Sequence, residues 1–243
     1  MNRRIIRVVN DVLEIHQRIR VARREVGTDV SGPACIYAQI RVTRGRLAYL
    51  TGDSRLTVTD CCELFLPPFA IVQAALERCD VTTLAVAFRP PGGVPDRPVV
   101  LPASNRPMVR SEAEVLERLQ TSRDVAYVGR APEPAPLAAN AKAIIDCEYS
   151  APLVIAGIAA RLETSPAVLS RVFKTTYGVP PVRYRHHVRI LDALVRLAEG
   201  AAPIDVFQDV GFDDLSRFYK VFRKVACDPP GSYRPLKSRS AKT

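Results

Sequence analysis

The sequence predicts an α+β protein of two domains, in which a small antiparallel β domain precedes an all-α domain. Two observations carry this prediction. Through roughly the first hundred residues short apolar segments alternate with turn residues, whereas beyond Pro136 apolar residues recur every three or four positions. In addition, the text of residues 169–185, "LSRVFKTTYGVPPVRYR", returns in similar form 49 positions later as "FYKVFRKVACDPPGSYR", residues 218–234.

Residues 1–105 are predicted to form the β domain. The segment "CIYAQIRV" (35–42) alternates apolar and polar residues with the period of two that a half-buried strand requires. "TRG" is then expected to turn the chain into "RLAYL", and "GDS" to turn it into "RLTVT"; "ELFL" and "TTLAVAF" complete the series. Strands this short and this frequent predict an antiparallel sandwich or a small barrel.

Residues 106–137 are expected to connect the two domains. They contain "SEAEVLERLQ", in which Ser111 and Glu114 have the spacing of a capping box and an apolar stripe follows, so a helix of about ten residues is predicted. "RAPEPAP" (130–136) has the composition of a stiff, extended linker. At the other end of the chain, residues 238–243 form a basic tail.

The composition favours a soluble protein with a polyanionic partner. The 243 residues carry a net charge of +10, and such a surplus attracts nucleic acid, anionic lipid or acidic protein. No apolar run approaches the roughly 18 residues that a membrane-spanning helix needs. Charge also interrupts "MNRRIIRVVND" too early for a secretory signal. We therefore expect a cytoplasmic protein that does not bind membranes.

The second domain, residues 138–237, contains two predicted helix-turn-helix units. In the first unit, "LVIAGIAARL" is followed by the turn "ETSP", and Ser165 is a good N-cap for a second helix over about 165–177. In the second unit, "IDVFQDV" is followed by the turn "GFDD", with Asp213 or Asp214 as the cap of a helix over about 214–226. The second helix of such a unit lies in the major groove of DNA.

Between the two units, "VRYRHHVRILDALVRLAEG" is predicted to form one long helix. About 18 residues at 1.5 Å each make a rod of roughly 27 Å. A rod of that length can hold two reader helices near one turn of DNA apart, about 34 Å. The repeated text therefore predicts that a monomer reads two successive segments of the major groove.

The sequence resembles the AraC/XylS family of transcription regulators. The resemblance rests on "IAARLETSPAVLSRVFKTTYGVPPVRYR" and "DVGFDDLSRFYKVFRKVACDPPGSYR", and "TRGRLAYL…LTVTDCCELFLPPF" is more loosely similar to the cupin-like effector domain of that family. It implies an activator that binds double-stranded DNA, works with RNA polymerase, senses a small-molecule effector and can form a homodimer. The chain departs from the family pattern at Glu163, Phe207, Leu215 and Ala226, so we expect the first unit to carry more of the specificity.

Matched position by position, the resemblance implies which residues contact DNA. Those expected to face bases are Ala167, Ser170 and Arg171 in the first reader helix and Leu215, Ser216, Tyr219 and Lys220 in the second. Lys174 and Arg223, one turn further on, are expected to contact phosphates. The chemistry agrees, because an arginine can donate two hydrogen bonds to guanine O6 and N7, and the methyl group of an alanine can contact thymine.

The remaining residues suggest neither a metal nor a cofactor, nor an enzyme active site. The six cysteines include no Cys-x-x-Cys pair, and the three histidines lie elsewhere. We expect one of Cys61 and Cys62 to be buried and the other exposed; a redox sensor, or a DNA-repair enzyme with a reactive cysteine, is an alternative. His186 and His187 are expected at the surface or facing phosphate. "RIRVARRE" (18–25) is either a basic arm or the wet face of a strand.

Together these observations predict a sequence-specific DNA-binding regulator, with an N-terminal β domain that senses a small molecule. By resemblance an activator is favoured over a repressor. A second interpretation stays open, in which the β domain binds a chaperone-like protein partner and DNA binding responds to that partner.

Overall fold

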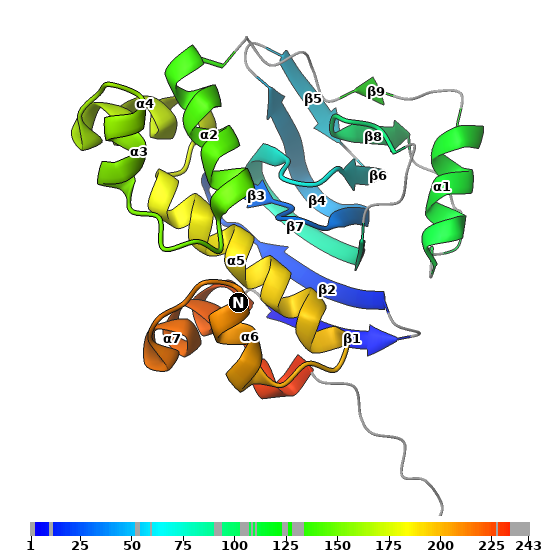
Figure 1. Cartoon of the computed structure of the whole chain (residues 1–243). Helices are drawn as coiled ribbons and strands as arrows, with labels where there is room; N and C mark the ends of the chain where they lie inside the picture. The colour runs from blue at the N-terminus through cyan, green and yellow to red at the C-terminus, as the bar shows by residue number, and fades with distance from the viewer. Residues whose placement is uncertain are drawn as a thin grey trace, which may run out of the picture.

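The structure is a computed structural model. It describes residues 3–9, 12–51, 54–58, 60–89, 94–102, 107, 109, 111–122, 126–127, 134–226 and 228–233. Strands dominate the first half of the chain and helices the second half (Figure 1). The two-domain α+β class predicted from the sequence is confirmed at this level. The predicted basic tail, 238–243, and most of the Pro-rich linker lie outside the described residues.

The strands form one antiparallel sheet. They are β1 (Arg3–Val9), β2 (Val12–Arg20), β3 (Arg24–Val30), β4 (Cys35–Thr51), β5 (Ser54–Val58), β6 (Cys61–Leu66), β7 (Ile71–Phe88), β8 (Val99–Pro102) and β9 (Ala126–Tyr127). The order is β1-β2-β7-β4-β6-β8-β9, with β3 paired to β7 and β5 to β4. Among the described strands this path is open, since no pairing joins β1 to β9, so the closed barrel expected from the sequence is not seen.

The longest strands, β4 and β7, correct one prediction from the sequence. The "TRG" segment does not turn the chain; it lies inside β4, where the register against β7 shifts on either side of Arg44. Gly45 has φ 79° and the facing residue Arg78 has φ 45°. The backbone oxygen of Arg78 is so close to Gly45 that a Cβ would not fit there. An irregularity of this kind bends a strand and continues it, where a hairpin would reverse it.

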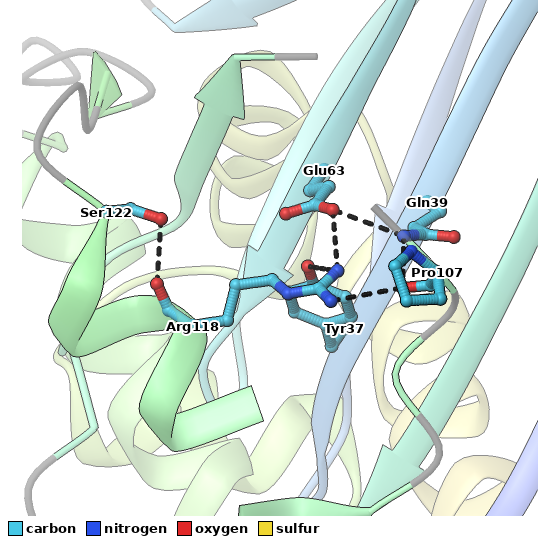
Figure 2. A network of polar contacts seen from close by, with 6 residues as sticks. All are labelled: Tyr37, Gln39, Glu63, Pro107, Arg118 and Ser122. Atoms are coloured by element: carbon cyan, nitrogen blue, oxygen red, sulfur yellow. Dashed lines mark hydrogen bonds and ion pairs between the residues drawn. The ribbon is translucent and has the colours of Figure 1, made fainter. Parts of the chain in front are cut away.

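The helix α1 (Glu112–Thr121) packs against the sheet rather than standing apart from it. Its N-cap Ser111 accepts a hydrogen bond from the N–H of Glu114 at 3.3 Å. Val115 is fully buried in a cluster with strand residues. Arg118 reaches the buried carboxylate of Glu63 on β6, at 2.8 Å (Figure 2). One apolar face and one ion pair therefore dock this helix.

The second half of the described chain is helical. Its elements are α2 (Pro136–Glu148), α3 (Ile155–Arg161), α4 (Pro166–Tyr177), α5 (Pro181–Ala198), α6 (Pro203–Asp209), α7 (Leu215–Ala226) and the short 3₁₀ helix η1 (Pro230–Tyr233). Each reader helix turns fully buried side chains into the core, Leu169 and Phe173 from α4 and Phe218, Phe222 and Ala226 from α7. None of the described helices combines the length and the apolar character that crossing a membrane requires.

The sheet and the helices share one continuous core. Figure 1 shows α5 lying across the sheet next to β2 and β3, and these are the strands that it contacts. Gly32, in the turn after β3, approaches Leu191 so closely that a Cβ there would lie 2.8 Å from that of Leu191. Just after the end of β7, Arg89 forms a bidentate ion pair with Glu199 at 2.7 and 2.8 Å. The connecting helix is therefore held by the sheet along its length.

Candidate nucleic-acid interface

The first reader helix, α4, has well-formed ends. Ser165 adopts an extended conformation and its hydroxyl accepts a hydrogen bond from the N–H of Val168 at 3.3 Å. Pro166 follows at the first helical position, where its missing N–H costs nothing. Gly178 ends the helix with φ 73°, a left-handed conformation that favours glycine. The sequence of the turn thus sets where the helix begins and ends.

The second reader helix, α7, begins in a similar way. The carboxylate of Asp214 accepts a hydrogen bond from the N–H of Ser216 at 2.8 Å. Of the two aspartates that the sequence offers as a cap, the hydrogen bond is made by Asp214; Asp213 is exposed. A carboxylate at this end also interacts favourably with the helix dipole.

All nine residues expected to contact DNA lie at least partly at the surface of α4 and α7. The exposed ones are Ala167, Arg171, Lys174, Leu215, Ser216, Lys220 and Arg223, and the half-buried ones are Ser170 and Tyr219. In Figure 1, α4 lies above α5 and α7 below it, both on the left-hand side of the view. Each helix therefore has a solvent-exposed face available to a partner and an apolar face in the core.

Buried polar contacts anchor α5 to the segment that follows α2. Arg189, only 4% exposed, donates hydrogen bonds to the backbone oxygens of Tyr149 at 2.5 Å and Ala151 at 2.9 Å. Burial, reinforced by Arg185 and Arg217, lowers the pKa of Arg189 to about 10. Asp192 accepts hydrogen bonds from Tyr149 and Arg196, each at 3.0 Å. These contacts tie the end of α2 to the middle of α5 and stiffen the rod.

The turns of the two units share a left-handed residue just after their first helix. In the second unit this residue is Gly211, with φ 88°; a side chain there would collide with the backbone of Ser150. In the first unit it is Glu163, with φ 50°. A non-glycine residue pays for that conformation in strain, so the departure noticed in the sequence is accommodated by the backbone without changing the turn.

Phe207, another of the departures noticed in the sequence, is also accommodated. It is 8% exposed and its ring centroid lies 6.3 Å from that of Phe218 on α7. The larger ring fills the core between α6 and the second reader helix.

Two features of this region were not anticipated from the sequence. Arg217 lies exposed on the first turn of α7, close enough to affect the pKa values of Arg185 and His186. His186 is half-buried, and its ring stacks on Phe212 at 5.9 Å. Burial, helped by the cations Arg217 and Arg185, lowers its pKa to about 4. In the alignment of the two repeats, Arg217 takes the place of Val168. This difference could have indicated from the sequence that the second reader helix has an additional exposed cation.

The cysteine pair offers little to a reactive-thiol mechanism. Cys62 is buried, and burial raises its pKa to about 12, while Cys61 is half-buried. A thiol with a raised pKa is a poor nucleophile, because the thiolate is the reacting species. Across the described residues, His, Cys, Asp and Glu side chains do not gather in threes as metal ligands do.

Comparison with known proteins agrees with this geometry. Residues 158–235 match the family described as "Helix-turn-helix domain". Over 81 residues the chain is 35% identical to the arabinose operon regulatory proteins of Salmonella typhimurium and Escherichia coli, a match that covers 33% of this chain. The same match covers only 29% and 28% of those two relatives.

Solved structures with some likeness are the C-terminal domain of AraT, a response regulator from Geobacillus stearothermophilus, and ToxT from Vibrio cholerae. AraT is 23% identical with a TM-score of 0.40, covering 46% of this chain and 97% of that one. ToxT is 10% identical with a TM-score of 0.46, covering 87% and 97%.

The structure thus contains two helix-turn-helix units with exposed reader helices, joined by the largely buried helix α5. The matched residues include both of these units almost entirely. Over these residues the chain is similar to the arabinose operon regulatory proteins, in agreement with the family resemblance seen in the sequence.

Proposed function

We propose that this protein is a sequence-specific activator of transcription that reads two adjacent major-groove segments of double-stranded DNA, one with α4 and one with α7. The observation that carries the proposal is the pairing of two capped reader helices whose outer faces present Arg171 and Lys220 to solvent. Groove-facing side chains must be accessible and held by a fixed core, and both conditions are met here.

The roles of individual residues follow from their chemistry. Arg171 can donate two hydrogen bonds to a guanine, which discriminates against the wrong base by roughly 1–3 kcal/mol. Ala167 offers a methyl-sized contact to thymine. Lys174, one turn further on, is a point charge suited to phosphate, which positions the helix but reads no sequence. In α7, Leu215 and Tyr219 supply apolar and mixed contacts, so specificity is concentrated in α4.

The test begins with selection of bound duplexes from a random pool, followed by footprinting of the full chain on the most enriched sequence. A protected region of two blocks about one helical turn apart is expected. A single protected block would show that only one unit reads DNA, and absence of any enriched sequence would overturn the proposal. A promoter fusion with purified RNA polymerase then separates activation from repression.

The N-terminal sheet is proposed to be a cupin-like effector domain that acts by population shift. Support comes from its direct packing on the reading machinery: Gly178, at the end of α4, faces the side chains of Gln73 and Thr28 with no room for a Cβ. Gly32, in the turn after β3, likewise lies so close to Leu191 of α5 that a Cβ would not fit there. A ligand that rearranged these strands would therefore move α4 and α5.

Calorimetry of candidate effectors, with and without the selected duplex, tests this coupling. Because linkage is reciprocal, an effector that changes DNA affinity must itself bind with a different affinity when DNA is present. Equal effector affinity in the two titrations would remove the coupling. Sedimentation at low protein concentration distinguishes a homodimer from a monomer in solution.

A further inference from the structure

The N-terminal sheet contains a cavity of about 710 Å³ that the DNA-reading surface does not explain. It is lined by residues of β2, β4 and β7 and of the turn after β2, namely Arg20, Val21, Ala22, Arg44, Arg78, Cys79 and Asp80. Its size lies within the range of small-molecule sites, roughly 300–1,000 Å³. Val21 and Cys79 are buried and close its floor, while the arginines lie exposed around them.

The bend between the two long strands holds two of these arginines in place. Arg44 stands opposite Asp80 in the register of β4 against β7, at the point where that register shifts. Arg78 has the left-handed φ of 45°, which is costly for a side chain of its size, and its backbone oxygen leaves no room for a Cβ at Gly45. Such strain is kept only where the surrounding structure imposes it, and it gathers at functional sites.

The charges around the cavity do not balance. Asp80 is the one carboxylate in its lining, and it is already engaged by Arg18, at 2.9 and 2.7 Å, and by Arg20, at 2.9 Å. Hydrogen bonds from Arg18 in particular hold the pKa of Asp80 down, at about 2, so this group remains an anion. Within the part of the chain that the structure describes, neither Arg44 nor Arg78 has a carboxylate within ion-pairing distance.

From this cavity and from Arg44 and Arg78, which form no ion pair with the described residues, we infer that the β domain binds a small polyanion, a molecule with two or more carboxylate or phosphate groups. Guanidinium groups hold such groups through paired, charge-assisted hydrogen bonds. The cavity is concave and no residue of α2–α7 lines it, which favours a small ligand over the DNA backbone. The basic segment 18–25 then acquires a role: Arg18 neutralises Asp80, and Arg20 lines the site.

This inference deepens the sensing role proposed above by naming the site and the ligand class, and its test does not require DNA binding. Citrate and inorganic pyrophosphate are titrated separately into the full chain by calorimetry at constant ionic strength. Saturable binding of one molecule per chain is expected for at least one probe. The variant Arg44→Gln/Arg78→Gln should lose affinity by about tenfold or more, because each removed guanidinium takes a charge-assisted hydrogen bond with it.

Arg55→Gln, which removes an exposed arginine on the neighbouring strand β5, is the matched control and should keep the wild-type affinity. Arg44 and Arg78 are both exposed, so their loss should leave the fold intact, and the single variant Arg44→Gln repeats the test if the double variant unfolds. No saturable heat with either probe, or equal affinity in wild type and variant, overturns the inference.

Footprinting of the same variants separates the two proposals. If the double variant binds neither probe but protects the selected duplex as the wild type does, the cavity binds anions and its arginines are not needed for DNA binding. If the wild type binds neither probe and the double variant weakens binding to every DNA sequence alike, these arginines contact phosphates of DNA and the small-ligand site is wrong.

Discussion

The guanidinium of Arg118 lies 2.8 Å from Oε1 of Glu63, and both side chains are largely withdrawn from water, with 12% and 4% of their surfaces exposed. Arg118 also donates to the backbone oxygen of Pro107 at 3.0 Å, and Gln39 donates to Glu63 at 3.2 Å (Figure 2). The pair joins α1 to β6. Such a pair adds little net stability, but removing one partner leaves the other charge buried and unpaired.

We therefore expect Arg118→Leu to lower the free energy of unfolding by about 3 kcal/mol or more, measured by urea denaturation. The double variant Glu63→Leu/Arg118→Leu should recover much of that loss, because no unpaired charge remains buried. Glu117→Ala, on the exposed side of the same helix, is the control and should change stability by less than about 0.5 kcal/mol. A small loss in Arg118→Leu would show that water reaches Glu63.

Replacing Arg171 should change which sequences are bound. Arg171→Ala is expected to relax the preference at one base pair and to weaken binding to the selected duplex by roughly 1–3 kcal/mol, with little effect on unrelated DNA. Quantitative gel-shift titrations against a panel of single-base variants measure this. An unchanged footprint and an unchanged base preference would mean that Arg171 does not read the groove.

Replacing Lys174 should change affinity without changing preference. Lys174→Ala is expected to weaken binding to all sequences alike and to reduce the slope of log affinity against log salt concentration by about 1, as the loss of a single phosphate contact does. The two variants thus form a matched pair on one helix. A sequence-dependent effect of Lys174→Ala would reassign this lysine to base contact.

The two left-handed turn residues should respond differently to substitution. Gly211→Ala is expected to destabilise the protein by roughly 2 kcal/mol or more, because the added Cβ meets the backbone of Ser150 and the residue must keep φ 88°. Glu163→Gly should be neutral or stabilising by up to about 1 kcal/mol, since it relieves strain at φ 50°. Thermal unfolding compares the two; equal effects would contradict this account.

His186 should make stability depend on pH between about 6.5 and 4. Its pKa is about 4 in the folded chain because burial and neighbouring arginines disfavour the charged ring, against about 6.5 when unfolded. As the pH falls through this window, His186 binds a proton in the unfolded state but not in the folded state, so the free energy of unfolding decreases. His186→Phe should remove this part of the slope, and an NMR titration that returned an ordinary pKa for His186 would contradict the assignment.

Much of the helical domain was predictable because its signals are local. Ser165, Pro166 and Gly178 mark the ends of α4 through short-range hydrogen bonds and backbone preferences, and the repeat at a spacing of 49 residues carries the same signals into α7. The strands were less well predicted. Arg44 and Gly45 look like a hairpin turn in the sequence, and only the shifted pairing with the distant strand β7, where Arg44 stands opposite Asp80, makes them a bend.

By itself, then, the sequence determined the two-domain class, the two reader helices and the residues on their outer faces, because helix period and capping depend on neighbours within a few positions. Only the tertiary structure decided that the sheet is open among the described strands, that Arg118 is buried against Glu63, and that Arg20, Arg44 and Arg78 surround one cavity. Those relationships join residues dozens of positions apart, and no local preference encodes which strands will meet.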